Sequence, residues 1–329
     1  MPAEPLAIRT RNGRAESVHH GHLVVLSADG ERVRRGNPDA GQYARSTMKP
    51  FQALPLVMTG AAEAYGLSER CLAIACASHA GEDAHREAVS ELLHGAGLVP
   101  EQLQCGVHAP LNEQSAAKLV ALGRSPDVLH NNCSGKHAGM LAVCRHQGWP
   151  LETYRDPEHP LQRRIRSTIA DLAEMPEAAL VHGVDGCGVP VWYLPLTALA
   201  RLFLMLGTPS LAPSPFRDAL TRLANAMASH PALVSGPGRL DTELMTAGSG
   251  ALLAKIGGEG VHAGGWRDRG LAWAIKVDDG NRRAIGPALA RALAQAGAPL
   301  PEAEALAAHV AAPTTNHHGQ VLGVMEAGW

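Results

Sequence analysis

The chain predicts a mixed α/β protein. Two stretches, Glu82 to Gly95 and Leu161 to Glu174, repeat apolar residues at the spacing of amphipathic helices. Two later stretches, 251–256 and 271–277, are short apolar runs bounded by glycine or aspartate, as strands commonly are. Because both patterns recur along one chain, we expect helices and sheet strands to contribute to the same fold.

The remaining elements follow from turn residues and prolines. Strands are predicted at 18–27 and 32–36, closed into a hairpin by Ala28-Asp29-Gly30. Residues 46–59 predict a helix that Pro55 should kink or end. Further predicted elements are a helix that includes 140–144, a strand at 180–184 and a helix at 287–295, with the glycine pairs 257–258 and 264–265 in the connections between the late strands.

The composition is that of a globular protein with a large core. The chain has 329 residues, of which 46% are hydrophobic and 18% are charged. The net charge is −2 and the basic residues are scattered, which argues against nucleic acid or an anionic membrane as partner. We expect residues 1–329 to form one catalytic unit of two intimately joined subdomains, because the proline-rich stretch 207–215 is too short for a linker.

The first residues of the chain, the length of its apolar runs and its cysteines together indicate where in the cell the protein resides. Residues 1–5 lack the charged and apolar regions of a signal peptide, and no apolar run approaches the length of about 20 residues that crosses a bilayer. The six cysteines are too dispersed to suggest a disulfide framework. We therefore expect a cytoplasmic protein with free thiols.

A serine and a lysine stand three residues apart at the start of the predicted helix 46–59. Residues i and i+3 share one helix face, so the amine of Lys49 can reach the hydroxyl of Ser46. A lysine kept neutral by burial or by a nearby cation can take the proton of such a serine. Ser-x-x-Lys is the acylation motif of penicillin-binding proteins and class A β-lactamases. The alternative is a helix N-cap serine followed by a surface lysine.

A second group of reactive side chains lies at 130–141. Cysteine, serine, lysine and histidine fall within the five positions Cys133 to His137, just before an apolar helical run. We interpret this segment as a polar loop at a helix N-terminus, where free N–H groups and the helix dipole favour a carboxylate or a thiolate. So many reactive side chains in one loop indicate function more than structure.

Together these segments resemble one family, the bacterial asparaginase II family of rhizobial-type, or class 3, L-asparaginases. The resemblance runs from about Val18 to about Ala288, with the motifs in the family's order. The segments that carry it are Arg45-Ser-Thr-Met-Lys-Pro-Phe-Gln-Ala53, Ser78-His-Ala-Gly-Glu82, Asn131 to Leu141 and Asp185-Gly-Cys-Gly188. It implies a fold similar to serine β-lactamases and glutaminases, with a helix-flanked sheet beside a mostly helical portion, and a homodimer.

The resemblance also implies a mechanism. Ser46 would attack the side-chain amide of asparagine with Lys49 as its base, and water would then release aspartate from the acyl-enzyme. Ser78 matches the family's second serine, whose lysine partner is best matched by Lys255, with Lys276 as a competitor. Two neighbouring lysines would lower each other's pKa and supply a neutral base.

A zinc site is implied as well. Cys133 and Lys136 are spaced Cys-x-x-Lys, and Cys187 lies in a distant glycine-rich turn. The family's corresponding residues bind Zn²⁺ beside the substrate, and two thiolates, an amine and a water would leave an open position. The alternative is that both cysteines are buried small apolar residues.

Three side chains are weaker candidates for substrate binding. Asp185 would accept an α-ammonium group or orient a ligand, unless it only forms its turn. His137 would hydrogen-bond behind the ligands, unless it is only a histidine at a helix start, and Arg45 would meet an α-carboxylate or pair with a structural acid.

We therefore predict a serine-dependent L-asparagine amidohydrolase. The alternatives are a glutaminase or another β-lactamase-like serine hydrolase, or a zinc- or amino-acid-binding protein on a decayed enzyme scaffold. Both serine–lysine pairs are intact, which argues against decay. Asparagine and glutamine differ by one methylene, which an apolar pocket discriminates by only about 1–3 kcal/mol.

Overall fold

The computed structural model describes residues 2–329, and the chain forms two compact units. Unit 1 comprises Met1–Thr47, Leu194–Leu211 and Glu243–Trp329, and unit 2 comprises Met48–Tyr193 and Ala212–Thr242. The chain therefore passes between the units several times, and the first crossing falls directly after Thr47. Both helices and strands are present, so the fold is mixed α/β as predicted.

Unit 1 is built on an antiparallel sheet. In the part of the chain that the structure describes, this sheet has eight strands in the order β10-β11-β1-β2-β9-β8-β7, with β3 paired to β2. The strands are β1 (Glu4–Arg11), β2 (Arg14–Ser27), β3 (Gly30–Arg35), β7 (Leu252–Ile256), β8 (Val261–Trp266), β9 (Leu271–Val277), β10 (Pro313–Thr315) and β11 (Val321–Ala327), and a further strand, β4, spans Gly41–Tyr43.

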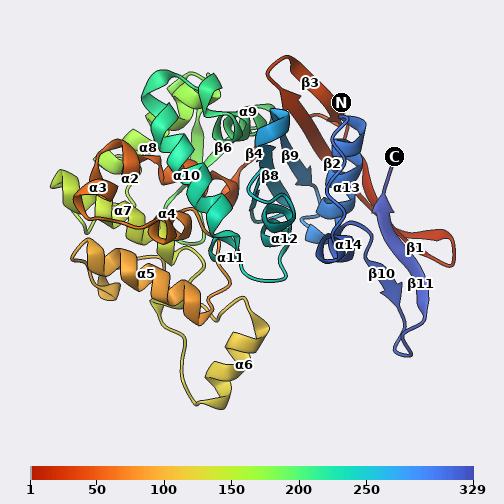
Figure 1. Ribbon diagram of the computed structural model, residues 1–329, viewed down its shortest axis with the longest axis horizontal. Helices are drawn as coiled ribbons and strands as arrows, with labels where there is room; N and C mark the ends of the chain where they lie inside the picture. Colours follow the sequence, from red (N-terminus) through yellow and green to blue (C-terminus); the bar gives the residue numbers. More distant parts are fainter. Residues whose placement is uncertain (1) are drawn as a thin grey trace. The chain divides into compact units, whose positions relative to one another are not determined.

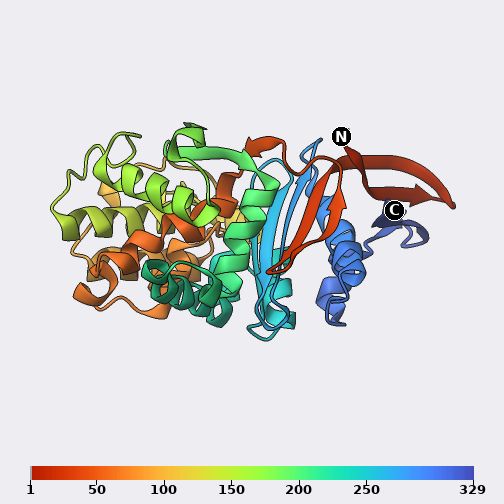
Figure 2. The same ribbon diagram turned by 90° about the horizontal axis from the view of Figure 1, so that it is seen from above.

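Helices cover both faces of this sheet. The helix α9 (Leu196–Gly207) packs on β2, β8 and β9, while α13 (Ile285–Gln295) packs on β1 and β11, and the two lie on opposite sides of the sheet (Figure 2). The helix α14 (Glu304–Val310) packs on α13. Because both faces are covered, every residue of β8 is buried.

Unit 2 is mostly helical. Its helices are α1 (Lys49–Gln52), α2 (Leu54–Met58), α3 (Ala61–Ala64), α4 (Glu69–Ala75), α5 (Asp83–Gly95), α6 (Glu113–Ala121), α7 (Ser134–Gln147), α8 (Pro160–Ala173), α10 (Arg217–Ser229) and α11 (Pro231–Val234). The helix α12 (Leu240–Ala247) and the strand β6 (Pro190–Pro195) each span a division between the units. None of the helices within residues 2–329 combines the length and the apolar character that crossing a bilayer requires.

The helix α7 forms the core of unit 2. Each of its residues from Ser134 to Cys144 is buried, and helices α1 to α5 and α8 surround it (Figure 1). Gly135 permits the closest of these approaches, because a Cβ atom there would lie 2.1 Å from the carbonyl oxygen of Ile74 in α4. Buried on all sides, α7 gives the side chains of its first turn fixed positions.

Most predicted elements are confirmed. The hairpin is β2 with β3, closed by the pair Ser27 and Gly30, and the amphipathic helices are α5 and α8. The predicted strands correspond to β5 (Val181–Val184), β7 and β9, and the late helix to α13.

Three local predictions are wrong. Residues 46–59 do not begin as an α-helix but as a 3₁₀ turn, Arg45–Met48, and the interruption expected at Pro55 falls at Ala53, between α1 and α2. Lys136 and His137 are not in a loop, because α7 begins at Ser134. The pair 264–265 is not a connection but lies inside β8, where the first glycine makes room for Trp273 and the second for α9.

Candidate active site

Lys49 is the first residue of α1 and is fully buried in unit 2. Its Nζ donates hydrogen bonds to the carbonyl oxygens of Ala77, at 2.7 Å, and of Asn132, at 3.0 Å. Burial lowers the pKa of Lys49, the Lys136 ammonium lowers it further, and the neighbouring thiols of Cys133 and Cys187 oppose the shift. A lysine in this environment loses its proton more readily than one in water and can act as a base.

Cys133 and Lys136 occupy the first turn of α7. Cys133 is the N-cap residue, and its N–H donates to Oδ1 of Asn131 at 2.8 Å. Lys136 is 3% exposed and its Nζ donates to Sγ of Cys187 at 3.0 Å. The helix N-terminus favours a thiolate at Cys133. The structure therefore brings the predicted Cys-x-x-Lys pair and the distant Cys187 together.

Cys187 lies in a hairpin turn. Strands β5 and β6 pair antiparallel up to Val184 and Pro190, and the turn is closed by hydrogen bonds from Asp185 N to Val189 O and from Gly188 N to Asp185 O. Short strands joined by such a turn fix the direction of a side chain at the tip. This turn points Cys187 at Lys136, which is 51 positions away in sequence.

The two thiols and two amines shift each other's ionisation. The hydrogen bond from Cys187 lowers the pKa of Cys133 well below its usual value, and a positive charge on Lys49 or Lys136 acts in the same direction. The same bond, with burial, raises the pKa of Cys187. Burial alone would lower the pKa of Lys136, but Cys187 and Cys133 outweigh it and raise that pKa. The cluster thus holds a thiolate and an ammonium ion side by side.

This cluster fits a zinc ion only if a lysine is a ligand. Among residues 2–329, no group of three or more histidine, cysteine, aspartate or glutamate side chains could hold a metal ion. Cys133 and Cys187 supply two sulfur atoms at one place, and Lys136 supplies a nitrogen once it is deprotonated. Two thiolates and a neutral amine are donors that suit Zn²⁺.

Ser78 lies in the segment between α4 and α5. It is 3% exposed, and within the described chain its Oγ has no hydrogen-bond partner. It directly follows Ala77, whose carbonyl oxygen accepts the bond from Lys49. Leaving a buried hydroxyl without a partner costs free energy, so its presence in a fold requires an explanation, and a role in a functional site is one.

The candidates Asp185 and His137 have different surroundings. Asp185 is half-buried and its Oδ1 accepts from the N–H of Gly186 at 2.8 Å, which stabilises the turn that carries Cys187. His137 is fully buried in α7, and its Nδ1 lies 2.6 Å from the hydroxyl oxygen of Tyr154. Burial keeps the pKa of His137 well below its usual value, so the ring is neutral.

The other candidates lie in unit 1. Arg45 and Ser46 are half-buried in the 3₁₀ turn, and Arg45 adopts the left-handed φ of +53°. The guanidinium of Arg45 lies against Gly258, where a Cβ atom would be 3.1 Å from its Cζ. Lys255 is three residues earlier, fully buried in β7, and its Nζ donates to the carbonyl oxygen of Ile256 at 3.0 Å. Unit 1 thus brings the turn with Ser46 and the turn after Lys255 into contact.

The competing lysine has another environment. Lys276 in β9 is half-buried, and its Nζ donates to the carbonyl oxygens of Glu259 and Val277, both at 2.6 Å. Burial lowers the pKa of Lys276 while Asp278 opposes the shift. The amine of Lys276 thus has two carbonyl partners, as the amine of Lys49 does.

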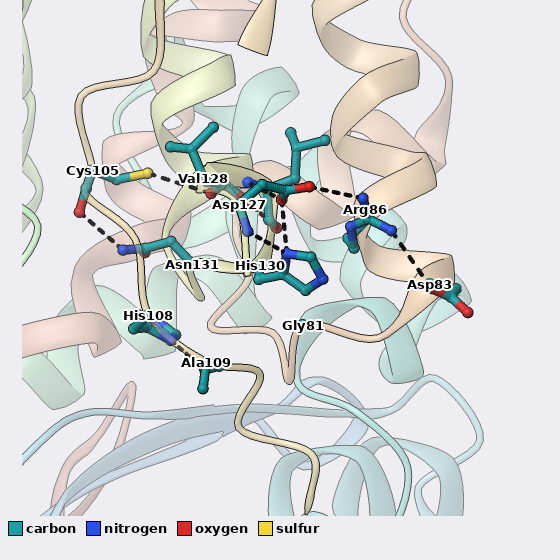
Figure 3. A network of polar contacts seen from close by, with 12 residues as sticks. Gly81, Asp83, Arg86, Cys105, His108, Ala109, Asp127, Val128, His130 and Asn131 are labelled. Atoms are coloured by element: carbon teal, nitrogen blue, oxygen red, sulfur yellow. Dashed lines mark hydrogen bonds and ion pairs between the residues drawn. The ribbon is translucent and has the colours of Figure 1, made fainter. Parts of the chain in front are cut away.

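A network of contacts holds residues 130–132, which directly precede Cys133, and the sequence motifs do not predict this network. Asn131 Nδ2 donates to the carbonyl oxygen of Cys105 at 2.9 Å, while the His130 ring contacts Asp127 at 2.7 Å (Figure 3). His108 Nε2 accepts from the N–H of Asn132 at 3.0 Å. Asn131 and Asn132 belong to the polar segment identified in the sequence, but their partners are distant in the chain.

Residues 7–327 match the model of the L-asparaginase II family. A comparison with curated proteins finds no match to the chain. Among solved structures, the chain is similar to a "putative beta-lactamase" from Bacteroides dorei DSM 17855, with 12% identity, a TM-score of 0.42, and coverage of 78% of this chain and 84% of that one.

The family match covers nearly the whole chain and identifies the class of protein as an asparaginase-type amidohydrolase. The chain belongs to the L-asparaginase II family. This confirms the resemblance that the sequence motifs indicate.

Proposed function

We propose that this protein hydrolyses the side-chain amide of L-asparagine to L-aspartate and ammonia. The observation that carries the proposal is Lys49, a fully buried amine whose pKa is lowered by burial, three residues after Ser46 in a chain of the L-asparaginase II family. A buried amine of this kind is what a serine nucleophile needs as its base near neutral pH.

The reaction has two steps. In the first, Oγ of Ser46 attacks the amide carbonyl carbon, Lys49 takes the hydroxyl proton, and the proton is passed to the nitrogen that leaves as ammonia. In the second, water attacks the acyl-enzyme ester and loses a proton to the amine, which passes it to the departing Oγ of Ser46, so that aspartate leaves and the serine hydroxyl is regenerated. Ser78 and Lys255 are assigned the roles of the family's second serine and its lysine.

The full burial of Lys255 supports its assignment over Lys276, which is only half-buried. Arg45 and Asp185 carry the charges that complement an α-carboxylate and an α-ammonium group, and His137 supports the first turn of α7 through Tyr154. These are the groups that would bind an amino acid by its ends.

We further propose that Cys133, Lys136 and Cys187 hold Zn²⁺. When bound, the ion would polarise or orient an oxygen of the substrate. The contact between Lys136 and Cys187 supports this ligand set. Removal of the Lys136 proton is required, so zinc affinity should rise with pH.

Two properties of the working enzyme belong to the proposal. A homodimer is expected for this family, and sedimentation velocity of the purified protein would test it. All six cysteines are free and buried, which suits a cytoplasmic enzyme, and fractionation of the source cells would test that location.

The test is ammonia release from L-asparagine and L-glutamine by the wild-type protein and by Ser46→Ala. We expect asparagine-selective release that falls by at least about 10³-fold in the variant, since loss of a covalent nucleophile has effects of this size. Release within tenfold of wild type would refute Ser46 as nucleophile, and preference for glutamine would change the substrate. No release from either substrate by folded wild-type protein would favour a binding protein.

A matched pair of lysine variants tests the second pair. Lys255→Met should lose most activity, whereas Lys276→Met should keep it within about threefold, because only Lys255 is assigned to the chemistry. The reverse result would transfer the role to Lys276. Circular dichroism melting curves of both variants control for unfolding.

A further inference from the structure

Both main-chain polar groups of Ser78 are held by one distant turn, 234–239, between α11 and α12. The N–H of Ser78 donates to the carbonyl oxygen of Val234 at 2.9 Å. The carbonyl oxygen of Ser78 accepts from Nη1 of Arg239 at 3.2 Å, and the same Nη1 donates to the carbonyl oxygen of Ser235 at 3.1 Å. A guanidinium nitrogen carries two hydrogens, so one can serve each carbonyl.

The turn lies directly against the segment that carries Ser78. Gly236 has a φ of +132°, and a Cβ atom there would lie 2.8 Å from the Cβ of Ala80. The hydroxyl of Thr242 donates to the carbonyl oxygen of Gly236 at 2.7 Å and fixes the turn from its other side. A residue other than glycine at 236 would force the two segments apart.

Two buried hydroxyl groups occur at this junction. Ser78 is 3% exposed and Ser235 is fully buried, and in the described part of the chain neither Oγ has a hydrogen-bond partner. Leaving a buried hydroxyl unpaired costs about 1–3 kcal/mol, so two neighbouring cases are not expected by chance. They are expected where a substrate or its water completes the bonding.

We propose that Arg239 is a positioning residue of the hydrolase site, bridging the carbonyl groups of Ser78 and Ser235 and thereby fixing the direction of both free hydroxyls. This inference rests on the proposed amidohydrolase function. Arg239 acts through the backbone of Ser78, whose carbonyl oxygen accepts its hydrogen bond. Lysine is not equivalent, because an ammonium group lacks the planar fork that spans two acceptors.

The test compares Arg239→Met and Arg239→Lys with a matched control, Arg217→Met. Arg217 also lies in unit 2 and also donates to a main-chain carbonyl, that of Ala212 at 2.8 Å, so its loss removes the same kind of bond elsewhere. The measurements are kcat and KM for L-asparagine, the melting temperature, and hydrogen exchange of the peptide 76–82 by mass spectrometry.

We expect kcat of Arg239→Met to fall by about 30-fold to 100-fold with KM within threefold of wild type, because misplacing a reacting group by about 1 Å has effects of this order. Exchange at 76–82 should accelerate. Arg239→Lys should lose about fivefold in kcat at an unchanged melting temperature. Arg217→Met should keep kcat within twofold.

Three other results would contradict the positioning role of Arg239 or restrict how it is tested. Equal losses of kcat in the two methionine variants at equal melting temperatures would make Arg239 merely structural. If Arg239→Met does not fold, wild-type kcat and exchange in Arg239→Lys would overturn the inference. If the wild-type protein releases no ammonia, the proposed function fails, and positioning is judged by exchange alone: wild-type protection at 76–82 in both Arg239 variants would then overturn it.

Discussion

Two buried histidines should make this protein sensitive to mild acid. His79, the residue after Ser78, and His85, in the first turn of α5, stack with ring centroids 5.1 Å apart. In each ring Nδ1 accepts a backbone N–H, from Gly81 and Glu82 respectively, at 3.2 Å. The Nε2–H of His85 donates to the carbonyl oxygen of Ala232 at 2.9 Å. Both rings are therefore neutral in the folded state, because protonation of Nδ1 would set two donors against each other.

The size of the expected loss of stability follows from the lowered pKa values of the two histidines. Burial lowers the pKa of His85 from the ordinary 6.5 to about 4 and holds the pKa of His79 well below its usual value. The unfolded chain binds the proton more tightly than the folded one. The contribution of the neutral histidine to the free energy of unfolding is therefore complete above pH 6.5 and is lost as the pH falls from 6.5 toward 4. For His85 alone the loss is about 2 kcal/mol at pH 5 and about 3 kcal/mol in full. His79 adds in the same direction.

The assay is urea denaturation at pH 7.5 and pH 5.0 for the wild type and for His85→Gln, whose side chain does not titrate. The variant should be less stable at pH 7.5, but its loss on acidification should be smaller by about 2 kcal/mol. His317→Gln, which removes an exposed histidine, serves as control. An identical loss in the wild type and in His85→Gln would refute the reasoning.

Two further predictions concern the zinc ligands and the packing of α7. Cys133→Ala should lose bound zinc by elemental analysis, whereas Cys144→Ala, a change at a buried cysteine of the same helix, should retain it; equal zinc content in both would remove the metal assignment. Gly135→Ala should lower the free energy of unfolding by more than about 3 kcal/mol, because its Cβ would meet a backbone carbonyl. Gly139→Ala should cost less than about 1.5 kcal/mol, because its Cβ would lie 3.2 Å from the side-chain methyl of Ala75; similar costs would contradict the packing argument.

Elements with a strong local pattern could be predicted from the sequence. The helices α5 and α8 follow from apolar periodicity, and the hairpin β2–β3 from its turn residues. The strands β1 and β11 could not be predicted in this way. They pair the two ends of the chain, with Ala7 opposite Ala327, and short half-buried runs carry little signal of such a distant partner.

Some residues of the candidate site could likewise be predicted from local sequence motifs, whereas the long-range contacts that hold them could not. Cys133, Lys136 and Ser78 stand in short polar motifs whose residue types already indicate chemistry. The bond from Arg239 to Ser78 joins residues 161 positions apart, and nothing near Arg239 in the sequence marks it. Likewise, Asn132 holds Lys49 through its carbonyl oxygen, a group that every residue has and that no motif can distinguish.

The sequence by itself determined the family, the reactive residue types and the elements with a regular apolar period, because these depend on neighbours along the chain. Only the tertiary structure decided that Lys49 is completely buried, that Cys187 reaches Lys136, and that the backbone of Ser78 is held by a turn far away. Burial and convergence depend on which segments pack together, and packing around α7 and the sheet of unit 1 sets the environment on which each group's reactivity depends.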